Sequence, residues 1–152
     1  MRIYILVLSV VLFVSCKDAL ETVTSDSYPE IIKALSINPV ALDNYAAQGK
    51  PAYVNKDNTA ANPITDKAAT LGRVLFYDKN LSVNNTISCA SCHKQEFAFG
   101  DTAVSSLGVE NGRTERHSMR LINSRYANEA KFFWNERAAS LEAQVTMPIV
   151  DH

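Results

Sequence analysis

Residues 89–93 have the sequence Cys-Ala-Ser-Cys-His, and this pentapeptide decides how the rest of the chain is interpreted. On a helix, side chains three and four positions apart share one face, so Cys89, Cys92 and His93 point to the same side. Two thiols at this spacing can form thioether bonds with the two vinyl groups of one haem, while the imidazole reaches its iron. The pattern therefore predicts a covalently bound haem c, attached through Cys89 and Cys92, with His93 as the proximal iron ligand.

Other chemistries fit the two cysteines less well. A thioredoxin-like thiol pair does not need the histidine and should follow a strand of a βαβ unit, for which the sequence gives no signal. A zinc site needs a further strong ligand, and only His117 and His152 remain as nitrogen donors. A disulfide across two intervening residues would be strained and would leave His93 unexplained.

The sixth ligand of the iron is not decided by spacing. Met147 lies far enough downstream of the pentapeptide to return over the haem, as in small electron-transfer cytochromes. A methionine at the end of a helix more often packs in a core or a loop, however. The candidates are His117, Met119, Met147 and His152.

The N-terminus has the layout of a secretory signal, with Arg2 followed by the largely apolar residues 3–14. This run is too short to span a membrane, which takes about 20 apolar residues as a helix. A small residue precedes Cys16, as in the lipobox of bacterial lipoproteins, although Phe13 stands where Leu, Val or Ile is usual. We expect residues 1–15 to be removed and Cys16 to be lipidated; an ordinary cleaved signal and an uncleaved anchor are the alternatives. The mature chain should then work in the periplasm or cell envelope, touching the membrane only through its lipid.

The composition limits the class of protein. The chain has 152 residues, which is enough for one domain with a core. Its 15 Lys+Arg against 16 Asp+Glu give a net charge of −1, which argues against a nucleic-acid partner because phosphate binding needs a basic excess or a basic face. Three cysteines are too few for a disulfide scaffold of this length.

Hydrophobic periodicity predicts a mostly α-helical protein, since no sustained alternation indicates a sheet. Residues 16–62 are expected to be a tether with one short helix, and residues 63–152 a haem domain. The expected helices are a short one capped by Ser27 with Pro29 in its first turn, Thr65–Tyr77 with Thr65 as its N-cap, Cys89–Lys94, Ser118–Tyr126, and Ser140–Met147, which Pro148 should stop.

Several longer motifs accompany the pentapeptide in a fixed order. They are Leu-Gly-Arg-Val-Leu-Phe-Tyr-Asp at 71–78, Ile-Ser-Cys-Ala-Ser-Cys-His at 87–93, Phe-Ala-Phe-Gly-Asp at 97–101, Phe-Phe-Trp-Asn-Glu-Arg-Ala at 132–138 and Ser-Leu-Glu-Ala-Gln at 140–144. With these motifs, the chain from about Ala68 onward resembles the N-terminal, peroxidatic haem domain of bacterial dihaem cytochrome c peroxidases. The resemblance implies an all-α, cytochrome c-like fold with irregular loops.

The resemblance also implies an activity, namely the reduction of hydrogen peroxide with electrons delivered from a second haem. The electrons would come from a small donor protein such as a cytochrome c or a copper protein. Trp134 would lie between the two haems as an electron conduit; as an unplaced tryptophan it would otherwise be expected in the core. Gln144 would face the distal pocket and hydrogen-bond peroxide or water, whereas its ordinary role would be that of an exposed helix residue.

This chain departs from the family's pattern in three places. The family's distal Glu, which belongs to a Glu-Met pair and is taken as the acid/base for O–O cleavage, would fall just beyond His152. The family's C-terminal domain, with its own haem motif, is absent from this sequence. We therefore expect a truncated, incomplete enzyme. By counting from His93, Val109 stands where some members have a loop His that ligates the resting haem. A calcium-ligand Asn of the family corresponds to His117, which argues against calcium binding.

Two functions from different classes follow from these residues. In the first, Val109 cannot ligate iron, so the haem is open to peroxide, while Gln144, an amide, cannot act as the general acid. In the second, the chain is a lipid-tethered mono-haem electron-transfer cytochrome with Met147 as sixth ligand. A truncated product that folds around haem without activity is a third alternative.

Overall fold

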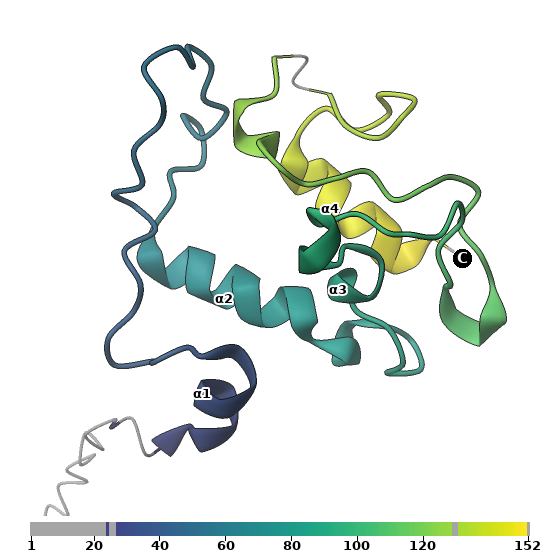
Figure 1. The fold of residues 1–152 in the computed structure, drawn as a ribbon, viewed down its shortest axis with the longest axis horizontal. Coiled ribbons are helices and arrows are strands. Elements are labelled where there is room, and N and C mark those ends of the chain that lie inside the picture. Colours follow the sequence, from purple (N-terminus) through teal and green to yellow (C-terminus); the bar gives the residue numbers. More distant parts are fainter. Residues whose placement is uncertain (1–23, 25–26, 129–130, 152) are drawn as a thin grey trace, which may run out of the picture.

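The computed structural model describes residues 24, 27–128 and 131–151, and its regular structure is mainly helical (Figure 1). The α-helices in these residues are α1 (Pro29–Leu35), α2 (Asp66–Tyr77), α3 (Cys89–Cys92) and α4 (Leu141–Val150). Short 3-10 turns and irregular loops connect them, and the described residues form isolated β-bridges but no strand. The predicted helical class is confirmed and is compatible with a cytochrome c-like domain. The predicted signal peptide 1–15, Cys16 and His152 lie outside the described residues.

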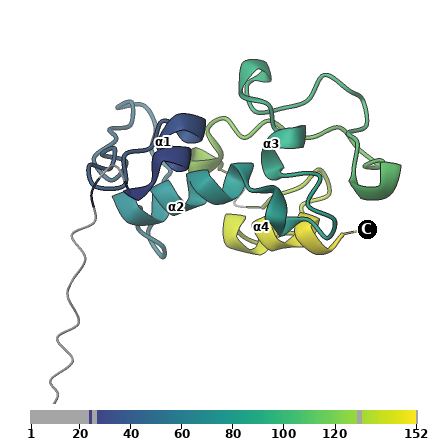
Figure 2. The same ribbon diagram turned by 90° about the horizontal axis from the view of Figure 1, so that it is seen from below.

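Helix α1 lies near α2 (Figures 1 and 2), and the two are joined by Arg73, whose guanidinium donates to the Leu35 carbonyl at the end of α1. Pro29 opens the helix, where its missing N–H costs nothing. The predicted Ser27 cap is wrong, because Tyr28 occupies the N-cap position and makes no side-chain capping bond. The helix ends at Leu35, and the next residue, Ser36, adopts a left-handed conformation with φ 53°.

Helix α2 begins as the sequence predicts. Thr65 is its N-cap, and the Thr65 hydroxyl accepts a hydrogen bond from the Ala68 N–H at 3.2 Å. The helix ends at Tyr77, after which the Asp78 carboxylate accepts from the Asn80 N–H at 2.9 Å and starts a short 3-10 turn. Helix α2 packs on α3, so it lies beside the helix that carries Cys89 and Cys92.

Two predicted helices differ from those observed. Residues 118–126 do not form a helix, because Asn123 is left-handed with φ 60° and only Ser124–Tyr126 make a 3-10 turn. Helix α4 does not stop at Pro148 but runs on to Val150. A proline removes one helical hydrogen bond and crowds the preceding turn, and this cost falls only two residues before the helix ends.

The described residues enclose little apolar core. Ile37 and Ala138 are the buried hydrophobic residues, and Ser106 is completely buried among the polar ones. Many large apolar side chains on α2 and α4 lie at the surface instead, among them Leu71, Leu75, Val145, Ile149 and Val150. None of the described helices is long and apolar enough to cross a membrane. The loop that follows α3 therefore depends more on polar contacts than on a large core.

Candidate haem c site

Helix α3 carries both predicted attachment thiols. The Ser88 N–H donates to the Ser91 hydroxyl at 3.0 Å, which fixes the first turn. Cys89 and Cys92 are free and half-buried, and burial raises the pKa of both thiols. Thioredoxin-like cysteines have a lowered pKa, so this environment does not match a thiol redox pair. The two sulfurs lie three residues apart on one helical turn, as attachment to haem requires.

His93 directly follows the helix, which ends at Cys92 rather than at the predicted Lys94. Its Nδ1 lies 2.8 Å from the Phe99 carbonyl oxygen. A carbonyl can only accept, so Nδ1 carries the proton and donates, and Nε2 keeps the lone pair that can bind a metal. A histidine that ligates a metal commonly makes such a bond with its other ring nitrogen. The donor set of two protonated thiols and one oriented imidazole therefore fits haem c.

The Phe99 carbonyl reaches His93 because residues 94–100 form a tight loop. The Lys94 N–H donates to the Gly100 carbonyl at 2.9 Å, and the Phe99 N–H donates to the Lys94 carbonyl at 2.9 Å. Ala98 and Phe99 are both left-handed, each with φ 57°. Such conformations are costly for residues other than glycine and persist only where the surroundings impose them.

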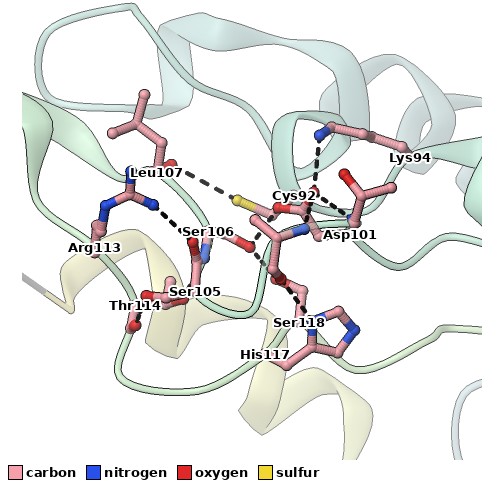
Figure 3. A network of polar contacts seen from close by, with 12 residues as sticks. Cys92, Lys94, Asp101, Ser105, Ser106, Leu107, Arg113, Thr114, His117 and Ser118 are labelled. Carbon is pink, nitrogen blue, oxygen red and sulfur yellow. Dashed lines mark hydrogen bonds and ion pairs between the residues drawn. The ribbon is translucent and has the colours of Figure 1, made fainter.

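A partly buried polar network lies against this loop (Figure 3). The Lys94 Nζ is 2.8 Å from Asp101 Oδ1, and the Asp101 side chain is only 4% exposed. The Ser106 hydroxyl donates to Asp101 Oδ2 at 2.7 Å and lies 2.8 Å from the Ser118 hydroxyl. The hydrogen bond from Lys94, followed by that from Ser106, holds the pKa of Asp101 well below its usual range. Asp101 is therefore an ionised carboxylate whose oxygens are largely covered by their hydrogen-bond partners.

Sequence reasoning missed this network. Asp101 belongs to the Phe-Ala-Phe-Gly-Asp motif at 97–101, but the sequence alone assigns no function to its side chain. A signal was present, since a lysine directly follows the pentapeptide and an acid stands seven positions later. Nothing in the sequence shows that a bridge between Lys94 and Gly100 brings the two side chains together.

Trp134 stands on a turn that the Phe132–Ala138 bridge closes. Its indole N–H donates to the His117 carbonyl at 2.9 Å, and the residue is 59% exposed. His117 Nδ1 lies 2.8 Å from the Ala103 carbonyl oxygen. Trp134 is therefore attached to the backbone of the segment that contains Ser118, and through it to the network around Asp101.

Gln144 and Met147 lie one turn apart on α4, so their side chains share a face of that helix. The Ser140 hydroxyl caps α4 by accepting from the Ala143 N–H at 3.1 Å. Asn62 donates to the Glu142 carboxylate at 2.9 Å. In Figure 2, α4 lies apart from α3. The structure thus gathers Cys89, Cys92 and His93 on and beside α3, while Gln144 and Trp134 stand on separate elements.

Val109 lies half-buried in a closed loop, in which the Gly108 N–H donates to the Gly112 carbonyl at 2.8 Å. Met119 is half-buried in the extended stretch before Asn123. Across residues 24, 27–128 and 131–151, no three His, Cys, Asp or Glu side chains cluster as a metal ion would need. The zinc alternative therefore lacks its ligand set in this part of the chain.

Comparisons with known proteins agree on one family. The model of the family described as "Di-haem cytochrome c peroxidase" matches residues 66–152. The methylamine utilization protein MauG of Methylorubrum extorquens is 36% identical over 89 residues, which cover 59% of this chain and 25% of MauG. The cytochrome c551 peroxidase of Pseudomonas aeruginosa is 30% identical over 107 residues, 70% of this chain and 30% of the peroxidase.

A comparison with solved structures also finds a relative of this family. The crystal structure of a MauG-like protein associated with microbial copper homeostasis matches with a TM-score of 0.61 and 36% identity. The match covers 66% of this chain and 31% of that protein. The chain thus spans between a quarter and a third of the length of these relatives.

Proposed function

The chain belongs to the di-haem cytochrome c peroxidase family, and on that premise we propose that it forms the haem c domain at which hydrogen peroxide is reduced. Cys89 and Cys92 would bind the haem covalently, and His93 would be its proximal ligand. Residues 63–152 would make up this domain. The second haem would be supplied by sequence outside this chain, which contains one Cys-X-X-Cys-His motif.

The observation that carries this proposal is the hydrogen bond of 2.8 Å from His93 Nδ1 to the Phe99 carbonyl. It fixes the ring and its tautomer, so that Nε2 is available to iron. Haem, when bound, would supply the redox-active iron at which the O–O bond of peroxide breaks. The overall reaction takes up two electrons and two protons and releases two molecules of water.

Two residues of this chain would act on the peroxide side. Val109 would stand where the family resemblance implies a ligating histidine in some members, and a valine there would leave the iron accessible. Gln144 would orient the substrate, because its amide can donate to one oxygen and accept from a neighbouring water. An amide cannot release a proton at neutral pH, so the proton for the leaving oxygen would come from water or from a residue outside this chain.

Trp134 would return electrons from the second haem. Its position supports this role: the indole N–H is anchored on the His117 carbonyl, while the residue stays 59% exposed, available for contact with further protein. The electron donor to the whole enzyme would be a small cytochrome c or a copper protein.

Export would bring the chain to the compartment where haem c is attached. Residues 1–15 would be the signal peptide, and Cys16 would carry lipid that anchors the protein to a membrane in the periplasm or cell envelope.

The test is the ferric optical spectrum of the haem-loaded chain, with Met147→Ala as the diagnostic variant. We expect the spectrum of a high-spin or water-ligated haem. Addition of hydrogen peroxide should change this spectrum, whereas the Met147→Ala substitution should not. A low-spin spectrum that loses this character in Met147→Ala would instead establish the electron-transfer cytochrome. Thr146→Ala, the exposed neighbour on α4, serves as the matched control.

A further inference from the structure

We propose that Lys94 and Asp101 form a clamp that holds the Phe99 carbonyl against His93 and thereby sets how strongly His93 donates electrons to the iron. Both are positioning residues, since neither would touch haem or substrate. The effect on the iron rests on the proposed function, whereas the clamp itself belongs to the protein.

The clamp closes the loop between its two ends. The backbones of Lys94 and Gly100 form a bridge, with the Lys94 N–H donating to the Gly100 carbonyl at 2.9 Å. Asp101 is the next residue, and its Oδ1 lies 2.8 Å from the Lys94 Nζ. The backbone bond therefore joins Lys94 to Gly100, and the ion pair joins Lys94 to the next residue, Asp101. The Phe99 carbonyl lies inside the loop that they close.

The loop needs such a restraint because of its conformation. Ala98 and Phe99 are successive left-handed residues, and neither is a glycine that would adopt this conformation readily. Without the ion pair, these residues would relax toward ordinary dihedral angles, which would turn the Phe99 carbonyl away from His93.

The anchor of the clamp is well fixed on the Asp101 side. Its Oδ1 also accepts from the Thr102 N–H at 2.7 Å, and its Oδ2 accepts from the Ser106 hydroxyl at 2.7 Å. Ser106 is completely buried and is itself bonded to Ser118 at 2.8 Å. Because these bonds fix both carboxylate oxygens, the ion pair holds the Lys94 ammonium group at a fixed position beside Asp101.

The consequence for the iron follows from the proton on Nδ1. A hydrogen bond from Nδ1 to a carbonyl makes the imidazole more basic and a stronger donor to the metal, which favours the oxidised iron. Loosening the Phe99 carbonyl weakens this effect. Loss of either clamp residue should therefore raise the reduction potential.

The direction of the shift separates a clamp from simple charge effects. A lysine near the haem raises its reduction potential and an aspartate lowers it, so charge alone predicts a fall in Lys94→Met and a rise in Asp101→Asn. The clamp predicts a rise in both. Lys94→Arg keeps the charge and a donor, and it should stay close to the wild-type potential.

The experiment is a redox titration of the haem-loaded chain, followed by its absorbance, for the wild type and these three variants. Lys131→Met is the matched control, because Lys131 pairs with the exposed Glu136 at 3.7 Å. A higher potential in both Lys94→Met and Asp101→Asn, with Lys131→Met unchanged, supports the clamp. A lower or unchanged potential in Lys94→Met overturns it, while the haem proposal stands.

Amide hydrogen exchange gives a second measurement that needs no haem. Exchange at Phe99 and Gly100 should become faster in Lys94→Met and Asp101→Asn and stay unchanged in Lys131→Met. If the wild-type chain takes up no haem, the proposed function fails, and this measurement still decides the clamp. Equal exchange rates in all variants would refute it.

Discussion

The two sides of the candidate site are held in different ways. On the proximal side, the hydrogen bonds around His93 come from residues 94–118, close behind it in the chain, and α2 packs on α3 from a short distance before it. On the distal side, α4 is reached by the Asn62 amide, 80 residues away from Glu142. The segment before Asn62 is tied in turn to residues 125–127, since the Asn58 N–H donates to the Arg125 carbonyl at 3.0 Å.

The region that would bind haem is therefore stabilised mainly by short-range hydrogen bonds. The region that would face peroxide is positioned by contacts with distant parts of the chain. Local contacts cost little loop-closure entropy, so the hydrogen bonds of the proximal side form at a low entropic cost. The distal side needs residues 57–62 in place. Changes on the proximal side should therefore affect haem binding, and changes on the distal side should affect stability and the position of α4.

The largest effect is expected from the attachment cysteines. Cys89→Ser and Cys92→Ser each remove a thioether, and the double variant should lose covalent haem entirely, as measured by the absorbance of denatured protein. Cys16→Ser is the matched control, because it should retain haem and lose only lipid. Covalent haem in the double variant would contradict the assignment of the site.

A second prediction concerns the dependence of stability on pH. The Arg125 guanidinium, with Thr59, holds the pKa of Asp57 well below its usual range. The folded carboxylate stays ionised at lower pH than the unfolded one, so its stabilisation is full above the ordinary pKa of about 3.9 and fades as the pH falls below it. Asp57→Asn should therefore lose less unfolding free energy than the wild type between pH 6 and pH 3.

Urea unfolding at the two pH values measures this difference. Asp43→Asn is the control, because Asp43 is largely exposed and its carboxylate lies 3.7 Å from Arg73. An Asp57→Asn variant with the same pH dependence as the wild type would show that the pair with Arg125 does not fasten the N-terminal segment.

The smallest effect is expected from the cap of α4. Ser140→Ala removes the hydroxyl that accepts from the Ala143 N–H, and loss of such a cap costs about 1 kcal/mol of unfolding free energy. Urea unfolding should show this loss, while Thr146→Ala on the same helix should stay within about 0.5 kcal/mol of the wild type. An unchanged free energy of unfolding in Ser140→Ala would mean that α4 is held in place by its other contacts.

The sequence allowed prediction of those features that depend only on residues close together in the chain. The spacing of Cys89, Cys92 and His93 predicts a shared helical face, and the structure places the cysteines on one turn with His93 directly after it. Thr65 before an apolar helix predicts an N-cap, and the observed bond to Ala68 confirms it.

The rest depended on contacts that no local pattern encodes. Ala98 and Phe99 are not turn-forming residues, so their left-handed conformations, and the carbonyl they aim at His93, could not be foreseen. The helix expected at 118–126 was wrong because Ser118 is engaged by the buried Ser106 and Asn123 breaks the helical dihedral angles. Tertiary contacts overrode the helical spacing there.

The contact from Asn62 to Glu142 bears on how this protein can be shortened. Sequence patterns place the domain boundary at residue 63, which would discard both Asp57 and Asn62. A chain trimmed at that point would lose its ion pair with Arg125 and its attachment to α4. A shortened version intended for crystallisation or spectroscopy should therefore begin before Asp57, so that the helix bearing Gln144 keeps its distant support.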